Sequence, residues 1–125
     1  KTYKIKHLGI LLTDSRVIPL RAGVVGVAVG YAGFSGIKDY RGSTDLFGRT
    51  LKITRVDVAD SLATAAVLLM GEGDERRPLA IITDAPVHFQ NRINRKELVI
   101  PPNDDLYAPL FGNIKLKRRW KRSKS

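Results

Sequence analysis

Three clusters of acidic side chains follow apolar stretches of the sequence, and they are its first candidates for chemistry. The clusters are Thr13-Asp14-Ser15, the pair Asp39 and Asp45, and the group Glu72, Asp74 and Glu75. Carboxylate and hydroxyl oxygens are the ligands that Mg²⁺ and Mn²⁺ prefer, and such cations commonly bridge protein carboxylates to phosphates. A metal–nucleotide site is therefore chemically allowed. The alternative is also open, because Asp and Ser after a strand are ordinary turn and capping residues.

Other kinds of site are excluded by residue type or spacing. The chain contains no cysteine, which removes disulfides, thiolate metal sites, iron–sulfur clusters and cysteine nucleophiles. Its two histidines, His7 and His88, have no His or Cys partner at ligand spacing, and we assign both to structure or surface. No serine lies in a Gly-x-Ser-x-Gly context, and the spacings of a Walker loop and of a dinucleotide-binding loop are missing.

Four arginines are candidates for pairing with phosphates or substrate carboxylates, because a guanidinium group binds such anions through two parallel hydrogen bonds. They are Arg16, Arg21, Arg41 and Arg49. The last two lie within a few residues of Asp39 and Asp45, so an ion-paired loop is the favoured interpretation of residues 39–49. Nothing in the sequence selects one of the four as a site residue.

The elements that must position these residues follow from hydrophobic patterning. Residues 8–13 form a continuous apolar run, which predicts a buried strand that ends in a polar loop at Asp14 and Ser15. Between residues 23 and 48 lie seven of the eleven glycines, a density typical of a tightly packed strand with bulges or of a turn-rich segment. Residues 51–56 alternate between apolar and polar side chains and predict a half-buried strand.

A helix has the strongest pattern in the sequence. Asp57 can cap it, apolar residues then recur at helical spacing, and Gly71 stops it. The charged loop of residues 71–78 follows, and residues 79–83 predict a second short buried strand, so strand, helix, loop and strand make a βαβ-like unit. Residues 97–100 are expected at a sheet edge, before a turn-rich connector at residues 101–105.

Length and charge limit the classes of protein to which the chain can belong. With 125 residues, of which 43% are hydrophobic and 27% charged, the chain has the composition of one globular domain. Its net charge is +10, and residues 115–125 contribute seven positive charges and no negative ones. We divide the chain into a domain over residues 1–114 and a basic tail over residues 115–125. The tail could contact nucleic acid through stacking on Trp120, but a solvated end without a recognition motif is the favoured interpretation.

No membrane contact is expected. The longest stretch without charge lies between Arg21 and Lys38 and contains five glycines, and it is shorter than the roughly 20 apolar residues that a spanning helix needs. No signal peptide is visible at the start of the sequence. We therefore expect a cytoplasmic protein. Because the sequence begins at Lys1 and its single methionine is Met70, we also expect a fragment or a processed product.

Six short motifs occur in a fixed order between residues 8 and 84. They are Ile10-Leu-Leu-Thr-Asp-Ser15, Pro19-Leu-Arg-Ala-Gly-Val-Val-Gly26, Asp39-Tyr-Arg-Gly42, Asp45-Leu-Phe-Gly-Arg49, Val58-Ala-Asp-Ser-Leu-Ala63 and Met70-Gly-Glu-Gly73. Together they resemble the gamma-glutamyl ligase family that acts on the deazaflavin coenzyme factor 420. Further downstream, Asp104-Asp-Leu-Tyr-Ala-Pro-Leu is similar to a bacterial branch of that family assigned to folate metabolism.

The resemblance implies an α+β fold with a mixed sheet and packed helices, assembled as an intertwined homodimer. It implies a GTP- or ATP-dependent ligase that requires Mg²⁺ or Mn²⁺ and joins L-glutamate to an acidic coenzyme or folate-like acceptor through an acyl-phosphate. The metal ligands that it implies are Asp14, Ser15 and Glu72, and the nucleotide contacts are Met70, Gly71, Glu72, Gly73, Asp74, Glu75, Arg76 and Arg77. Many relatives have glutamine at the position of Glu72. No catalytic residue is assigned.

Members of that family carry a substantial upstream portion, which includes further nucleotide contacts and another metal-binding aspartate. This sequence resembles the part that follows it. Two other interpretations therefore stay open. One is a non-catalytic binding module whose basic termini contact nucleic acid, and the other is a structural half of a larger ligase.

Overall fold

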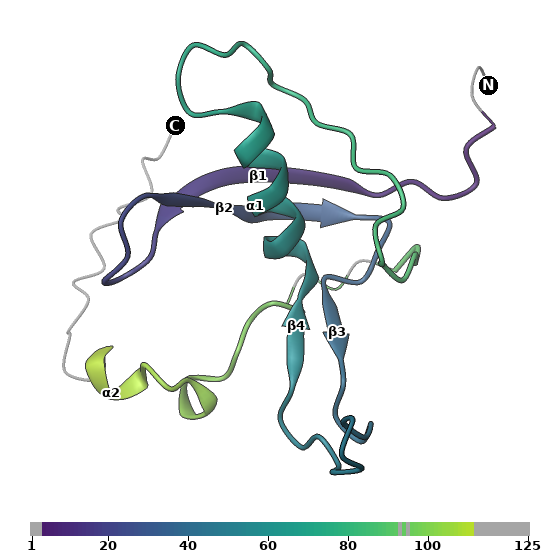
Figure 1. Ribbon diagram of the computed structural model, residues 1–125, viewed down its shortest axis with the longest axis vertical. Helices are drawn as coiled ribbons and strands as arrows, with labels where there is room; N and C mark the ends of the chain where they lie inside the picture. The colour runs from purple at the N-terminus through teal and green to yellow at the C-terminus, as the bar shows by residue number, and fades with distance from the viewer. Residues whose placement is uncertain (1–3, 93, 95, 112–125) are drawn as a thin grey trace, which may run out of the picture.

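The computed structural model describes residues 4–92, 94 and 96–111, which form two small sheets, one longer helix and two short helical turns (Figure 1). The elements in chain order are β1 (Ile10–Val17), β2 (Val24–Ala32), β3 (Ile37–Asp39), β4 (Arg55–Asp57), α1 (Val58–Met70), the 3₁₀ helix η1 (Pro102–Asp104) and α2 (Ala108–Phe111). This combination agrees with the predicted α+β class. The prediction of a mixed sheet was wrong for the residues that the structure describes, because both sheets there consist of one antiparallel pair of strands.

β1 and β2 form an antiparallel hairpin with a bulge after Leu12. The strand predicted at residues 8–13 is displaced, since β1 extends through Asp14 and Ser15 instead of ending before them. The predicted burial was also wrong, because side chains alternate along β1, and Ile10 and Leu12 are each 64% exposed. A hairpin with one open face lets polar side chains continue the strand without losing their water.

Helix α1 begins and ends where the sequence predicts. The Asp57 carboxylate accepts a hydrogen bond from the Asp60 N–H at 2.9 Å, and Gly71 ends the helix with a φ of +84°. The helix lies across the β1–β2 sheet (Figure 1) and packs mainly on β2. Gly26 of β2 permits this close approach, because a Cβ there would overlap the carbonyl group of Ala63. The packing therefore rests on small residues on both sides.

β3 and β4 pair antiparallel at the base of a long hairpin. We call residues 37–57 the arm, which projects away from α1 and the β1–β2 sheet (Figure 1). β4 covers only the end of the strand predicted at residues 51–56, and the chain before it is irregular. The base of the arm is joined to α1, because the Gly36 carbonyl accepts hydrogen bonds from the Val58 N–H at 2.8 Å and the Ala59 N–H at 3.1 Å.

Two predicted strands are not formed. Residues 79–83 make no strand pairing, and Leu79 and Ile81 are 86% and 89% exposed, so the βαβ-like unit was wrong. A strand needs a neighbour for its backbone hydrogen bonds, and apolar composition alone does not supply one. Residues 97–100 form a turn and an irregular stretch instead of a sheet edge. The connector predicted at residues 101–105 holds the η1 turn.

The core of the described part is small. Its buried hydrophobic residues are Phe34, Ala59, Ala63, Ala66 and Val67. Within the same part, no helix combines the length and the apolar character needed to cross a membrane. The basic tail predicted at residues 115–125 lies outside the described residues, so the division of the chain at residue 114 stays a prediction.

Candidate functional site

Two of the predicted metal ligands lie in contact although they come from distant parts of the chain. Ser15 belongs to the set of β1 side chains that is partly covered on the α1 side. Glu72 follows Gly71, the residue that ends α1, so the helix carries it to the same end of the sheet. The Ser15 hydroxyl donates a hydrogen bond to Glu72 Oε1. The resemblance predicted both residues as metal ligands, but the contact itself results from the packing of α1 across the sheet.

Asp14, the third predicted metal ligand, belongs to the exposed set of β1 side chains. Its Oδ1 accepts a hydrogen bond from the Ser15 backbone N–H at 2.8 Å. In residues 4–92, 94 and 96–111, no group of three or more His, Cys, Asp or Glu side chains is arranged to hold a metal. The structure therefore brings Ser15 and Glu72 together and leaves Asp14 apart from them, although the oxygen donors of all three are of the type that a hard cation prefers. Mg²⁺ commonly completes such a partial set with water and phosphate oxygens.

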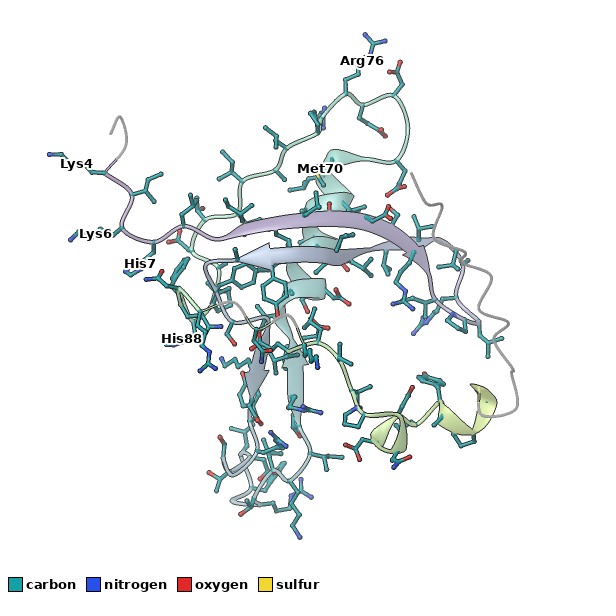
Figure 2. All side chains as sticks on the ribbon, turned by 180° about the vertical axis from the view of Figure 1, so that it is seen from behind. Lys4, Lys6, His7, Met70, Arg76 and His88 are labelled. Atoms are coloured by element: carbon teal, nitrogen blue, oxygen red, sulfur yellow. The ribbon has the colours of Figure 1, made fainter. Side chains whose placement is uncertain are left out.

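The predicted nucleotide contacts form one continuous segment, from the last residue of α1 through the loop of residues 71–77. Glu75 folds back over this loop, and its Oε2 accepts a hydrogen bond from the Gly73 N–H at 2.8 Å. Asp74 and Arg76 form an ion pair at 2.8 Å with both side chains more than four-fifths exposed. The loop extends away from the sheet to Arg76 (Figure 2). Its charges face solvent, where a phosphorylated ligand could reach them.

A cavity of about 330 Å³ opens beside this loop, and we call it the β1–α1 cavity. β1, α1 and residues 78–89 contribute most of its lining, which includes Leu11, Leu62, Met70 and Pro78. Most of the lining side chains are apolar. Because Met70 and Pro78 flank the loop, the predicted nucleotide contacts border this cavity.

Two acidic residues of the arm, Asp39 and Asp45, are paired with arginines, which confirms the ion-paired interpretation of residues 39–49. Arg41 Nε donates to Asp39 Oδ1 at 2.9 Å, and the hydrogen bonds from Arg41 lower the pKa of Asp39 to about 2. The Arg49 N–H donates to Asp45 Oδ1 at 2.9 Å and its Nε to Oδ2 at 2.8 Å, and these bonds lower the pKa of Asp45. Both carboxylates are therefore engaged in local structure.

Glu97 organises a cluster that the sequence did not single out. Its carboxylate accepts hydrogen bonds from Tyr31 OH at 2.7 Å, from Ser35 Oγ at 2.7 Å and from the Gly36 N–H at 2.9 Å. Burial would raise the pKa of Glu97, but these hydrogen bonds outweigh burial and lower that pKa. Burial and the bond to Glu97 raise the pKa of Tyr31. The cluster joins residues that share no spacing in the sequence, so no local signal could have found it.

Comparison with known proteins identifies the family of this chain. A family model described as F420-0:Gamma-glutamyl ligase matches residues 1–84. The coenzyme F420:L-glutamate ligase of Methanococcus maripaludis strain C6 is 44% identical over 102 residues, and that of Methanocaldococcus jannaschii is 43% identical over 102 residues. The enzyme of the same name from Methanothermobacter thermautotrophicus is 45% identical over 103 residues.

Each of these alignments covers 82% of this chain and 41% of the relative. The chain therefore spans about two fifths of the length of the curated relatives that it matches. The family match covers two thirds of the chain and includes Asp14, Ser15 and the segment up to residue 84. This chain belongs to the F420-0:gamma-glutamyl ligase family.

Proposed function

We propose that the chain forms part of a ligase that joins L-glutamate to a coenzyme F420 acceptor through a gamma-glutamyl amide bond. The family match and the names of the three relatives support this reaction. Those names specify F420 and L-glutamate, which favours a deazaflavin coenzyme over a folate-like acceptor. Because the chain spans two fifths of these relatives, the proposal concerns the protein to which its residues contribute.

Amide formation from a carboxylate needs an activated acyl group, and GTP or ATP supplies the activation in this proposal. A carboxylate oxygen of the acceptor attacks the terminal phosphorus of the nucleotide, and the nucleoside diphosphate leaves. The amine of L-glutamate then attacks the carbonyl carbon of the acyl-phosphate, phosphate leaves, and the nitrogen loses a proton. Since these steps need no protein nucleophile, the residues of the chain act by binding, orientation and electrostatic stabilisation.

Asp14, Ser15 and Glu72 would hold the divalent cation, Mg²⁺ or Mn²⁺, together with phosphate oxygens of the nucleotide. When bound, the cation neutralises charge on the transferred phosphoryl group. The observation that supports this assignment is the contact between Ser15 and Glu72, which joins a hydroxyl and a carboxylate from separate segments. The negative charge of Glu72 would either tighten the binding of a cation or weaken the approach of phosphates.

The loop of residues 71–77 would contact the nucleotide, with the guanidinium groups of Arg76 and Arg77 available to phosphate oxygens. The partners in this proposal are a nucleotide, L-glutamate, an acidic acceptor and a second copy of the chain in a homodimer. Binding of nucleic acid through residues 115–125 is the alternative. Deletion of those residues would separate the two, because it should abolish salt-sensitive binding of nucleic acid and leave nucleotide binding unchanged.

Calorimetry with GTP and ATP, in the presence and absence of Mn²⁺ or Mg²⁺, tests the nucleotide and metal site. The salt concentration should be high enough to screen the basic tail. We expect saturable binding that requires the metal and that Asp14→Asn abolishes. Asp84→Asn is the matched control, because Asp84 is an exposed carboxylate outside the proposed site. Equal affinity of Asp14→Asn and the wild-type chain, with the fold retained, would contradict the metal assignment.

Mass spectrometry tests the acceptor separately. Incubation with L-glutamate, nucleotide and a deazaflavin coenzyme should add the mass of one glutamyl residue to the coenzyme. A folate acceptor should stay unmodified under the same conditions. Glutamylation of the folate alone would reverse the choice of acceptor while leaving the ligase assignment in place.

A further inference from the structure

A second cavity, of about 370 Å³, is lined by residues of β1, β2 and the first turns of α1, and we call it the β2–α1 cavity. It shares no lining residue with the β1–α1 cavity. Its volume exceeds the roughly 150 Å³ of a protein cavity that admits benzene, so the cavity has space for a small amino acid or dicarboxylic acid. Charged and hydroxyl side chains contribute to its lining, which distinguishes it from the largely apolar β1–α1 cavity.

The α1 side of the β2–α1 cavity is rich in oxygen atoms that can accept hydrogen bonds. Asp60 Oδ1 accepts from the Ala28 N–H at 2.8 Å, and among the described residues its Oδ2 has no hydrogen-bond partner. Asp57, the N-cap of α1, adds a second carboxylate to the lining. The hydroxyl groups of Ser61 and Thr64 donate to backbone carbonyls, so their oxygens can still accept. This side therefore suits a group with several N–H donors.

Neither carboxylate of this cavity has a positively charged partner in the part of the chain that the structure describes. The ion pairs there lie in the arm and in the loop of residues 71–77, and neither Asp57 nor Asp60 takes part. Burial raises the pKa of Asp57, and the charge of Asp60 adds to this rise. A cation in the cavity would lower the cost of keeping both carboxylates ionised.

Arg16 supplies the opposite charge in the same cavity. It lies opposite Val25 in the β1–β2 register, and both residues line the cavity. Arg16 is exposed and takes part in none of the ion pairs among the described residues. Its guanidinium group can therefore bind a carboxylate through two parallel hydrogen bonds. Because Arg16 directly follows Ser15, the cavity begins next to a residue of the proposed metal site.

We propose that the β2–α1 cavity binds L-glutamate as a zwitterion, with a carboxylate on Arg16 and the ammonium group against Asp60 and Asp57. This inference rests on the proposed function, in which L-glutamate is the substrate that carries the amine. The two carboxylates repel the phosphates of a nucleotide, and the arginine repels an inorganic cation. A ligand that carries both charges matches both sides of the cavity, so Arg16 and Asp60 select an amino acid.

NMR titration of the ¹⁵N-labelled chain with L-glutamate tests the position of the site. We expect saturable shifts of the backbone amide signals of residues 25–27 and 60–64, and no shifts in the loop of residues 71–77. Arg16→Gln should weaken binding by about tenfold or more, because a hydrogen-bonded charge is lost. Arg21→Gln is the matched control and should bind as the wild type does, since Arg21 is exposed and outside the lining. Equal weakening by both variants, or a wild-type chain without saturable shifts, would overturn the proposal.

Glutarate separates the two sides of the cavity, because it has both carboxylates of L-glutamate and no amine. Arg16→Gln should weaken the binding of both ligands. Asp60→Asn should weaken the binding of L-glutamate by about tenfold and leave glutarate at least as tightly bound. Asparagine retains an oxygen for the Ala28 N–H, so the variant should fold, and thermal unfolding checks this. Equal loss of both ligands in folded Asp60→Asn would overturn the assignment of the ammonium group.

The glutamylation assay separates this site from the ligase assignment. If the coenzyme is glutamylated, Arg16→Gln should raise the KM for L-glutamate by about tenfold or more and leave metal-dependent nucleotide binding unchanged. Glutamylation with an unchanged KM would overturn the proposed cavity and leave the ligase in place. Binding of L-glutamate in the cavity without glutamylation of any acceptor would overturn the ligase assignment and leave an amino-acid site.

Discussion

The packing of α1 on the β1–β2 sheet depends on Gly26, and we predict that Gly26→Ala destabilises the protein. A Cβ at this position would lie 2.6 Å from the carbonyl carbon of Ala63, whereas ordinary contacts begin at 3.4 Å. The carbonyl oxygen would lie closer still, and because both atoms belong to the helix backbone, α1 must move outwards by about 1 Å to relieve the overlap. Two hydrogen bonds cross this contact, from Thr64 Oγ1 to the Gly26 carbonyl at 2.9 Å and from the Ala28 N–H to Asp60 Oδ1 at 2.8 Å.

The magnitude follows from three contributions. Overpacking of a well-packed contact costs about 1–3 kcal/mol, and weakening the two hydrogen bonds costs about 1 kcal/mol more. The lower conformational entropy of alanine in the unfolded chain offsets about 0.4–1 kcal/mol. We therefore expect Gly26→Ala to lower the free energy of unfolding by about 2–3 kcal/mol.

Gly30→Ala is the matched control, since Gly30 lies in the same strand. A Cβ there meets no atom within 4 Å and its φ is not positive, so only the entropy contribution remains and the variant should be slightly more stable. Urea unfolding at pH 7 should separate the two variants by about 3 kcal/mol, or about 10 °C in Tm for a chain of this length. Equal stabilities would refute the inference that the backbones of α1 and β2 are in close contact.

Two further predictions concern carboxylates that hold the base of the arm and the start of α1. Glu97→Ala should lower the free energy of unfolding by about 2 kcal/mol at pH 7, because three donors lose an ionised acceptor. Folding lowers the pKa of Glu97, so its contribution to the free energy of unfolding is complete above the unfolded pKa near 4.3 and disappears as the pH falls through the lower folded pKa. Urea unfolding between pH 7 and pH 3 should therefore show the stabilities of wild type and Glu97→Ala converging as the pH falls. A difference in stability that stays constant over this range would contradict the reasoning. Asp57→Ala should lower the free energy of unfolding by about 1 kcal/mol, because it removes the N-cap of α1. Asp57→Asn should cost little, because burial raises the pKa of Asp57 and a neutral amide caps the helix without the cost of burying a charge. Thermal unfolding of both variants measures the difference.

Features that depend on neighbours in the sequence were predictable. Asp57 and Gly71 define the ends of α1 through hydrogen bonds and backbone angles within a few residues, so the sequence alone located the helix. The pairing of Asp39 with Arg41 likewise joins residues two positions apart. In both cases the interaction energy comes from residues that are close together in any conformation of the chain.

Features that depend on distant residues were not predictable. Residues 79–83 have the composition of a buried strand, but that composition does not reveal whether another strand lies beside them. The outer face of β1 shows the same limit, because burial of Leu12 would require a cover that no local pattern encodes. The contact between Ser15 and Glu72 spans 57 positions and follows from how α1 crosses the sheet. Only the resemblance to a family indicated that these two residues belong to one site.

The position of Glu72 relative to Ser15 is therefore a property of helix packing, and this links the stability of the fold to the candidate site. A helix transmits a displacement along its axis with little change, because its backbone hydrogen bonds make it stiff. A shift of α1 by about 1 Å at Gly26 should consequently separate Ser15 from Glu72. Gly26→Ala should weaken metal-dependent nucleotide binding at temperatures where the variant is still folded, whereas Gly30→Ala should not. Calorimetry on both variants measures this, and unchanged binding by folded Gly26→Ala would mean that the loop after α1 is positioned by its own bonds.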